Sequence, residues 1–382
     1  MIFSEELRLI TGERNIREAL SFIESNEPKV INKQVSLCEI AAPTFQENMR
    51  AQEFVSMFKE IGANGIEIDG VGNVIVERKG IVGGPPLVLA AHLDTVFPEG
   101  TDVKVRRRGN IFQAPGIGDN SRGLAVLLGI YEAMERFNIR TKSDVIFLGD
   151  VGEEGLGNLG GIQFFLEHFT GLQSFISFDG SGNETICFLG LSSNRYQVSY
   201  SGLGGHAFNN FGTPSAINVL GKGIAKIADL KLPKKNPIAI INIGLIKGGS
   251  AVNAIAEYAE MCVDIRSSCP EYLKSLSDKF LSSLERVLDQ VNQKGQDKLS
   301  MDWELIGCRP GGKQRRNSTI VRNAVEVTRF LGLDPILQGY KSTSANLPMS
   351  LGIPSLTLGS GVTDTHIIQL KGHPDSRTWI HS

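Results

Sequence analysis

A histidine and an aspartate directly follow an apolar run that predicts a buried strand. The run covers residues 87–91, and His92 and Asp94 come after it. Side chains at positions i and i+2 of an extended chain point the same way, so both can act at one strand end. Imidazole is a common ligand of divalent metals, and a carboxylate that accepts its second ring N–H fixes its tautomer. The simpler alternative is a histidine that is only held by a neighbouring carboxylate.

Asp119 lies in a glycine-rich segment, 116–123, just before a helical pattern that begins at Leu124. Glycines around an acidic residue let the backbone turn tightly enough to present its side chain. An aspartate at this place can instead cap the helix by accepting backbone N–H groups. The sequence leaves both interpretations open.

Two adjacent glutamates, Glu153 and Glu154, stand between Gly152 and Gly155, shortly after an apolar run at 145–149. Neighbouring carboxylates repel each other unless a cation or protons compensate their charge. A solvated pair on a surface loop is the alternative, although such a loop would not need flanking glycines. The pair supplies two candidates for metal binding or proton transfer.

Two further polar residues follow apolar runs in the same manner. Asp179 comes after residues 175–178, and His366 comes after residues 355–358, in a chain with only 6 histidines. Mixed imidazole and carboxylate ligands suit zinc, and suit cobalt or manganese less selectively. Two such cations held close together activate water and stabilise an oxyanion. The five polar clusters therefore predict a site with two divalent metal ions.

The apolar runs that carry these residues alternate with helical patterns. Strands are expected at 87–91, 145–149, 175–178 and 355–358, and a helix at 124–137. This alternation favours an α/β domain with a mostly parallel central sheet. In open α/β sheets the functional site lies at the carboxyl ends of the strands, so we expect the five clusters to converge there.

A segment from 191 to 305 has a different pattern, which predicts an inserted α+β two-layer domain. It contains three alternating stretches and two helical patterns, at 195–200, 238–245, 257–266, 215–228 and 270–292. A chain of 382 residues also favours two domains over one hydrophobic core. We expect a catalytic domain of residues 1–190 and 306–382, with residues 191–305 as the insertion.

The charge balance argues against a nucleic-acid-binding protein. The formal net charge is -2, and lysines and arginines are scattered apart from short runs at 106–108 and 313–316, which we expect to be solvated loops. No apolar run reaches the length of a membrane span, and the N-terminus lacks a secretion-signal pattern. The 5 cysteines are far apart and fit neither a disulfide framework nor a zinc cage. We therefore expect a cytoplasmic protein that binds neither nucleic acid nor membrane.

The order and context of these motifs resemble the M20 family of metallopeptidases and deacylases. The resemblance covers nearly the whole chain, including Gly-Gly-His at 204–206 and Val-Asp-Ile-Arg at 263–266. It implies a zinc-peptidase-like catalytic domain that hydrolyses an amide bond in a small peptide or an N-acyl amino acid. It also implies that the insertion is a dimerisation or lid domain and that the protein is a homodimer.

The resemblance further implies which residues hold the metals. Asp119 would bridge two divalent ions, most simply zinc, with cobalt or manganese as alternatives. His92 and Asp179 would complete one metal site, and Glu154 and His366 would complete the other.

The same resemblance implies the remaining roles. Glu153 would be the general base that takes a proton from the bridging water and passes it to the leaving amine. Asp94 would support the metal-bound histidine. His206 would reach into the partner subunit's site and polarise the scissile carbonyl. Asn253 and Arg266 would hold the backbone or carboxylate of the substrate, Arg266 through a bidentate pair.

The C-terminal part departs from the family pattern. Residues 367–370 are Ile-Ile-Gln-Leu, where the family usually has an acidic residue soon after the histidine. His373 therefore competes with His366 for the role of last ligand, although His366 has the better spacing from Gly359. Ser344 stands where many relatives have aspartate, which alters an interaction behind the ligands.

Other functional classes have weaker support. The glycine spacing at 155–160 fits a dinucleotide-binding turn, but the two glutamates before it would repel a pyrophosphate. The motifs of serine hydrolases and of single-zinc His-Glu-x-x-His proteases are absent from the sequence. An inactive binding module with the same fold is the alternative from another class. Among enzymes, aspartate at position 179 favours, by resemblance, a tripeptidase-like aminopeptidase over a deacylase or carboxypeptidase.

Overall fold

The computed structural model describes residues 4–109, 111–293, 297–361 and 379–381, and the structural statements below concern these residues. The chain divides into two compact units, Met1–Gly190 with Gly312–Ser382, and Leu191–Gly311. The expected return to the first unit at residue 306 is therefore several residues too early. Strand β15 (Ser300–Arg309) pairs with β10 (Ser192–Ser201) as far as Arg309, so the whole strand belongs to the inserted unit.

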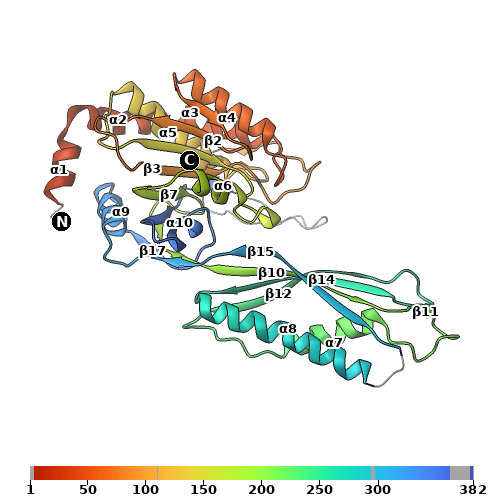
Figure 1. The fold of residues 1–382 in the computed structure, drawn as a ribbon. Coiled ribbons are helices and arrows are strands. Elements are labelled where there is room, and N and C mark those ends of the chain that lie inside the picture. The colour runs from red at the N-terminus through yellow and green to blue at the C-terminus, as the bar shows by residue number, and fades with distance from the viewer. Residues whose placement is uncertain (1–3, 110, 294–296, 362–378, 382) are drawn as a thin grey trace. The chain divides into compact units, whose positions relative to one another are not determined.

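An eight-stranded mixed sheet with the order β1-β2-β6-β3-β7-β18-β8-β17 forms the centre of the first unit (Figure 1). Its strands are β1 (Ile66–Ile68), β2 (Val74–Arg78), β3 (Leu87–His92), β6 (Val145–Asp150), β7 (Ser174–Phe178), β8 (Thr185–Cys187), β17 (Ile336–Gln338) and β18 (Ser355–Leu358). Strands β6, β3, β7 and β18 are parallel, whereas β1–β2, β2–β6 and β18–β8 pair antiparallel. The expected mostly parallel sheet is parallel in its centre and mixed towards its edges.

Helices cover both faces of this sheet, and strand β6 shows why. Val145 and Phe147 face a core shared with α4 (Asn48–Glu60) and α5 (Ser121–Arg136). Ile146 and Leu148 face a second core shared with α6 (Gly160–His168). Successive side chains of a strand point to opposite faces, so a strand that is buried on both faces is a continuous apolar run. This is the pattern from which the four central strands were expected.

The rest of the first unit consists of short elements around this sheet. They are α1 (Glu5–Gly12), α2 (Arg14–Ser25), α3 (Glu27–Cys38), β4 (Arg106–Arg108), β5 (Ile111–Gln113), η1 (Gly155–Gly157), β9 (Leu189–Gly190), β16 (Gly312–Lys313), α9 (Thr319–Phe330), α10 (Asn346–Ser350) and β19 (Trp379–His381). The arginine run at 106–108, expected as a solvated loop, is exposed but forms strand β4, which pairs with β5.

The inserted unit has two layers. Its antiparallel sheet has the order β12-β14-β10-β15, with β12 (Ala239–Gly248) and β14 (Tyr258–Ser267). Helices α7 (Ala216–Ala228) and α8 (Pro270–Asn292) pack on this sheet through one apolar core (Figure 1). A separate two-stranded pairing joins β11 (Gly205–His206) to β13 (Ala254–Ile255).

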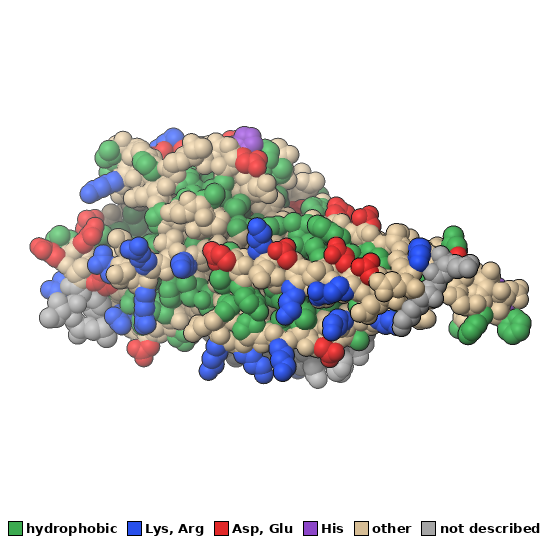
Figure 2. Space-filling view, turned by 60° about the horizontal axis from the view of Figure 1, so that its bottom comes forward, with side chains coloured by type: hydrophobic (Ala, Val, Ile, Leu, Met, Phe, Trp, Pro, Cys, Tyr) green, Lys and Arg blue, Asp and Glu red, His purple; other side chains and the backbone are tan. Residues whose placement is uncertain are grey.

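Surface charge is mixed, as the formal net charge of -2 predicts. Figure 2 shows acidic and basic side chains interspersed over the face in view. Among the residues described, no helix combines the length and the apolar character needed to cross a membrane.

Candidate metal centre

Four of the five expected polar clusters come together at the carboxyl ends of the parallel strands. His92 is the last residue of β3, Glu153 and Glu154 lie in the loop after β6, and Asp179 directly follows β7. The ligand-type atoms of His92, Asp119 and Asp179 lie within 4.8 Å of one another. Those of His92, Glu153 and Glu154 satisfy the same limit. One imidazole is thus shared by two groups of carboxylates.

His92 is only 1% exposed, and its ring nitrogens have different neighbours. Nδ1 lies 3.0 Å from the backbone oxygen of Asp94, which can only accept, so Nδ1 carries the proton and donates. Nε2 points to Oδ1 of Asp119 at 2.8 Å. Burial opposes the charged ring, but hydrogen bonding to Asp119 and Asp94 raises the pKa of His92 well above its usual value. The nitrogen that faces the carboxylate cluster is therefore the one suited to a metal.

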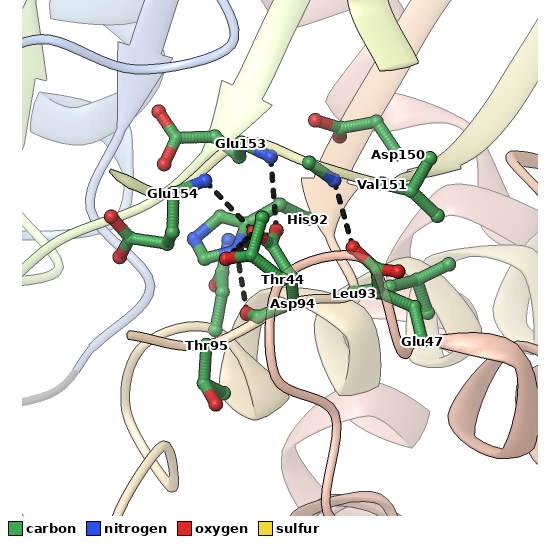
Figure 3. Close-up of polar contacts among 12 residues, drawn as sticks. Thr44, Glu47, His92, Leu93, Asp94, Thr95, Asp150, Val151, Glu153 and Glu154 are labelled. Carbon is green, nitrogen blue, oxygen red and sulfur yellow. Dashed lines mark hydrogen bonds and ion pairs between the residues drawn. The ribbon is translucent and has the colours of Figure 1, made fainter. Parts of the chain in front are cut away.

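Asp94 is fully buried, and its carboxylate connects the turn after β3 to the loop after β6 through hydrogen bonds (Figure 3). Its carboxylate accepts hydrogen bonds from the backbone N–H groups of Glu153 at 3.0 Å and Glu154 at 2.9 Å. It also accepts one from Oγ1 of Thr44 at 2.9 Å. Burial opposes ionisation, but the contact with His92 and these hydrogen bonds lower the pKa of Asp94. Asp94 thus fixes the backbone of both glutamates as well as facing the histidine ring.

The helix cap of α5 is Asn120 rather than Asp119. Oδ1 of Asn120 accepts from the N–H of Gly123 at 3.1 Å, and its Nδ2 donates to the oxygen of Phe178 at 2.8 Å. A Cβ atom on Gly123 would lie 2.6 Å from that oxygen, so only glycine permits this close approach. The two interpretations of Asp119 are resolved: its carboxylate faces His92, and the neighbouring residue caps the helix.

The two glutamates are not a solvated surface pair, because Glu153 is only 3% exposed and Glu154 is partly buried. Burial, followed by the charges of Glu153 and Asp119, raises the pKa of Glu154 well above its usual value. Burial and then Asp119 raise the pKa of Asp179 to about 7. Crowded carboxylates of this kind favour a bound cation, and an imidazole with several carboxylates is a donor set that fits a divalent metal.

Gly157, in the segment 155–160, packs tightly within the chain. A Cβ atom on Gly157 would lie 2.6 Å from Cα of Gly152, so the loop folds closely on itself. Helix α6 then begins at Gly160. Packing within the chain therefore accounts for Gly157, the middle glycine of the spacing that also fits a dinucleotide-binding turn.

The segment that leads into α4 contributes side chains that the sequence motifs did not indicate. Oε1 of Glu47 accepts from the N–H of Gly152 at 3.1 Å (Figure 3). Arg50 is fully buried and donates to the oxygen of Leu93 at 2.9 Å. One segment therefore holds both the turn after β3 and the loop after β6. The sequence offered one signal, because Glu47 and Arg50 are an acidic and a basic residue one helical turn apart. The local sequence does not reveal their partners, which lie far away along the chain.

Ser344 and Asp150 form a buried pair behind the ligands. Asp150 ends β6, and Oγ of Ser344 donates to its Oδ2 at 2.7 Å. Burial raises the pKa of Asp150 to about 7. The interaction expected at position 344 is thus the hydrogen bond to Asp150, a residue that the sequence motifs did not indicate.

The other expected site residues lie in the inserted unit. His206 is exposed, and its Nδ1 accepts from the N–H groups of Phe208 at 3.3 Å and Asn209 at 3.4 Å. Asn253 is also exposed, and Nε of Arg266 donates to Asp264 at 2.7 Å.

The expected last metal ligand, His366, and its competitor, His373, lie outside the described residues. The structure therefore leaves the choice between them as a prediction.

Comparisons with known proteins agree on one family. The family model of Peptidase family M20/M25/M40 matches residues 88–337. Succinyl-diaminopimelate desuccinylase of Corynebacterium glutamicum is 24% identical over 346 residues, which cover 88% of this chain and 88% of that protein. Carboxypeptidase G2 of a Pseudomonas species is 28% identical over 314 residues, covering 80% of this chain and 68% of that protein.

The crystal structure of a tripeptidase from Staphylococcus aureus has the same fold. It matches with a TM-score of 0.72 and 25% identity, over 89% of this chain and 92% of that one. The three similar proteins have different activities by name, so they share a family without indicating one substrate.

Proposed function

The chain belongs to peptidase family M20/M25/M40, and from this membership we propose that it hydrolyses an amide bond in a small peptide or N-acyl amino acid with two divalent metal ions. The observation that carries the proposal is the cluster in which His92 is shared by two groups of carboxylates. Such a constellation at the strand ends of an α/β sheet supports metal-assisted hydrolysis.

We propose that His92 and Asp179 hold one ion, that Glu154 and His366 hold the other, and that Asp119 bridges them. The short distance between Nε2 of His92 and Oδ1 of Asp119 supports the first site and the bridge. The donor set suits zinc, with cobalt or manganese as alternatives. When bound, the ions would lower the pKa of a water molecule and polarise the scissile carbonyl.

Glu153 is proposed as the general base. Its N–H is held by the Asp94 carboxylate, and its side chain is buried among the ligand candidates. In this position it can take a proton from the attacking water and deliver it to the leaving amine. Asp94 acts through its neighbours, because it orients both the His92 ring and the Glu153 backbone.

The inserted unit supports a homodimer. Strand β12 is an edge of its sheet and exposes Leu245 (60%) and Ile246 (57%). An exposed apolar edge strand is a pairing surface. The loop after His206 also exposes Phe208 (85%) and Phe211 (92%). We propose that this loop carries His206 to the partner's site.

We propose that substrate contacts also come from the inserted unit. The exposed amide of Asn253 and the partly exposed guanidinium of Arg266 would hold the backbone or carboxylate of the substrate.

For the substrate we propose a tripeptidase-like aminopeptidase activity, which the aspartate at 179 and the similarity to a tripeptidase support. The similarity to a desuccinylase and a carboxypeptidase makes deacylation or carboxypeptidase activity the second candidate.

The test is a panel of tripeptides, dipeptides and N-acyl amino acids, assayed after metal removal and again with zinc, cobalt or manganese. Hydrolysis should require added metal. Glu153→Gln should keep bound metal and lose about 10²- to 10⁴-fold in turnover. The matched change next to it, Glu154→Gln, should lose metal. Undiminished turnover in chelator would refute the metal mechanism, and a metal-loaded protein that cleaves nothing would favour the binding-module alternative.

A further inference from the structure

Lys341 places an ammonium group directly beside the residue that follows Asp179. A side chain at position 180 would overlap Nζ of Lys341, and Gly180 has a φ of +86°, which also favours glycine. The backbone of Lys341 is anchored, because its N–H donates to the oxygen of Leu189 at 3.1 Å. The lysine is thus held from its backbone and packs against the edge of the ligand cluster.

This ammonium forms no ion pair with the residues that the structure describes, although the lysine is partly buried. Lys33, which is similarly buried, differs in this respect because it pairs with Glu132 at 2.9 Å. A partly buried charge without a partner is costly, and an incoming anion would relieve that cost.

The ammonium of Lys341 lies against Gly180, the residue next to the proposed metal ligand Asp179. A substrate bound at the ligands would therefore meet a fixed cation on the Asp179 side. A carboxylate at that place would be attracted, and an ammonium would be repelled.

We propose that Lys341 is a specificity residue that binds a carboxylate of the substrate. This inference rests on the proposed amide hydrolysis and narrows its substrates to those that carry a carboxylate near the scissile bond. Free peptides and N-acyl amino acids both have one at their C-terminus. The simpler alternative is that Lys341 only balances the charge of the acidic cluster.

The experiment compares Lys341→Met and Lys341→Arg with the matched control Lys33→Met, which removes a partly buried ammonium that already has a partner. Each variant is assayed on a substrate that the wild type hydrolyses. It is also assayed on analogues of that substrate in which one carboxylate at a time is replaced by a carboxamide. Lys341→Met should raise KM for the carboxylate form by about 10- to 100-fold, the usual value of a charge-assisted hydrogen bond. For one carboxamide form, the wild type should have a KM as high as that of Lys341→Met for the carboxylate form. Lys341→Met should not change the KM for that carboxamide form.

The control and the conservative variant complete the design. Lys341→Arg should recover most of the affinity, and Lys33→Met should change neither form by more than about twofold, as expected for a charge away from the site. Equal losses on the carboxylate and all carboxamide forms, or an unchanged KM, would overturn the proposal. If Lys341→Met binds less metal and loses activity equally on the carboxylate and carboxamide forms, the role of Lys341 is to balance the charge of the acidic cluster.

A binding measurement separates this inference from the proposed function. If the metal-loaded wild type cleaves no member of the panel, the proposed function fails. Calorimetric titration of metal-loaded wild type and Lys341→Met with N-acetyl amino acids and their amides still tests Lys341. Binding of the acids that is weakened by Lys341→Met, while binding of the amides is not, supports the carboxylate site. Equal binding by both proteins refutes it.

Discussion

Oε1 of Glu47 accepts a hydrogen bond from the backbone N–H of Gly152 at 3.1 Å, although 105 positions separate the two residues. The same oxygen accepts from the N–H of Phe45 at 2.9 Å. Gly152 has a φ of +61° and directly precedes the proposed base. A carboxylate at the start of α4 therefore helps to set the direction in which Glu153 leaves the backbone.

Replacing Glu47 should misplace the base without removing a ligand. Glu47→Ala leaves the buried N–H of Gly152 unsatisfied, which costs about 1–3 kcal/mol of stability. A small displacement of a catalytic group can cost about 10²-fold in rate, so kcat should fall by about 10- to 100-fold while metal content and KM change little.

Glu47→Gln should recover most of this loss, because an amide oxygen can accept the same hydrogen bonds. Glu60→Ala, an exposed change on the same helix, is the control for a lost carboxylate. Steady-state kinetics, metal analysis and thermal melting measure the three effects. If Gln and Ala reduce kcat equally, the charge of Glu47 matters rather than its acceptor oxygen.

Protons and metal should compete for the carboxylates of the site. The pKa of Asp179 is raised to about 7 and that of Glu154 is raised as well, so both tend to be protonated at lower pH and ionise as the pH rises. Ligation requires the ionised form. Metal affinity should therefore increase towards neutral and higher pH, by about tenfold per pH unit for each proton displaced.

The stability of the metal-free protein should change in the opposite sense. A raised folded-state pKa contributes stability below the unfolded-state pKa, and this contribution is lost as the pH rises through the folded value of about 7. Metal should therefore restore more stability at about pH 8 than at about pH 5. Competition with a chelating dye and melting curves with and without metal test this. An affinity that stays constant with pH would contradict it, and Asp179→Asn should weaken the dependence.

The buried pair of Asp150 and Ser344 should tolerate only one carboxylate. Ser344→Asp would place a second acidic group against Oδ2 of Asp150, where both residues are at most 1% exposed. Unpaired charges in such a place are strongly destabilising, by about 3–5 kcal/mol. Adding Asp150→Asn should restore most of the lost stability, since the pair then again contains one carboxylate, at position 344, beside one neutral side chain. Urea unfolding of the metal-free single and double variants measures the coupling, and additive losses would refute it.

The four central strands of the first unit could be predicted because their burial on both faces leaves a continuous apolar run, as at 87–91 and 355–358. The expected 355–358 strand has the bounds of β18. Strand β15 escaped notice because its side chains are mostly exposed and do not alternate between buried and exposed. A strand of that kind is recognised only by its pairing with β10.

The candidate site could be predicted where a polar side chain directly follows an apolar run, as Asp179 does. The role of Asp119 stayed open because Asp and Asn both cap helices, and only the geometry distinguishes it from Asn120. Arg50 could not be found, because its partner Leu93 lies 43 positions away and is contacted through a backbone oxygen that has no sequence signature.

The last prediction concerns His206. Its Nδ1 accepts from two backbone N–H groups, so the neutral ring carries its proton on Nε2, and the residue is exposed. An N–H of this kind can donate to an oxyanion. His206→Ala should therefore lower turnover by about 10²- to 10³-fold without changing metal content. His168→Ala, which removes an exposed histidine that stacks on Phe164, is the control and should have no such effect.

If His206 acts in the partner's site, two inactive variants should complement each other. A heterodimer of His206→Ala and Glu153→Gln chains contains one site in which the base and the donor are both intact. Random exchange of subunits makes half of the dimers mixed, with one working site of two, so activity should return towards about a quarter of wild type. Mixing must be verified by mass measurement of differently tagged chains. Verified exchange without any return of activity would place His206 in its own chain's site, because each site of a mixed dimer then lacks either the base or the donor.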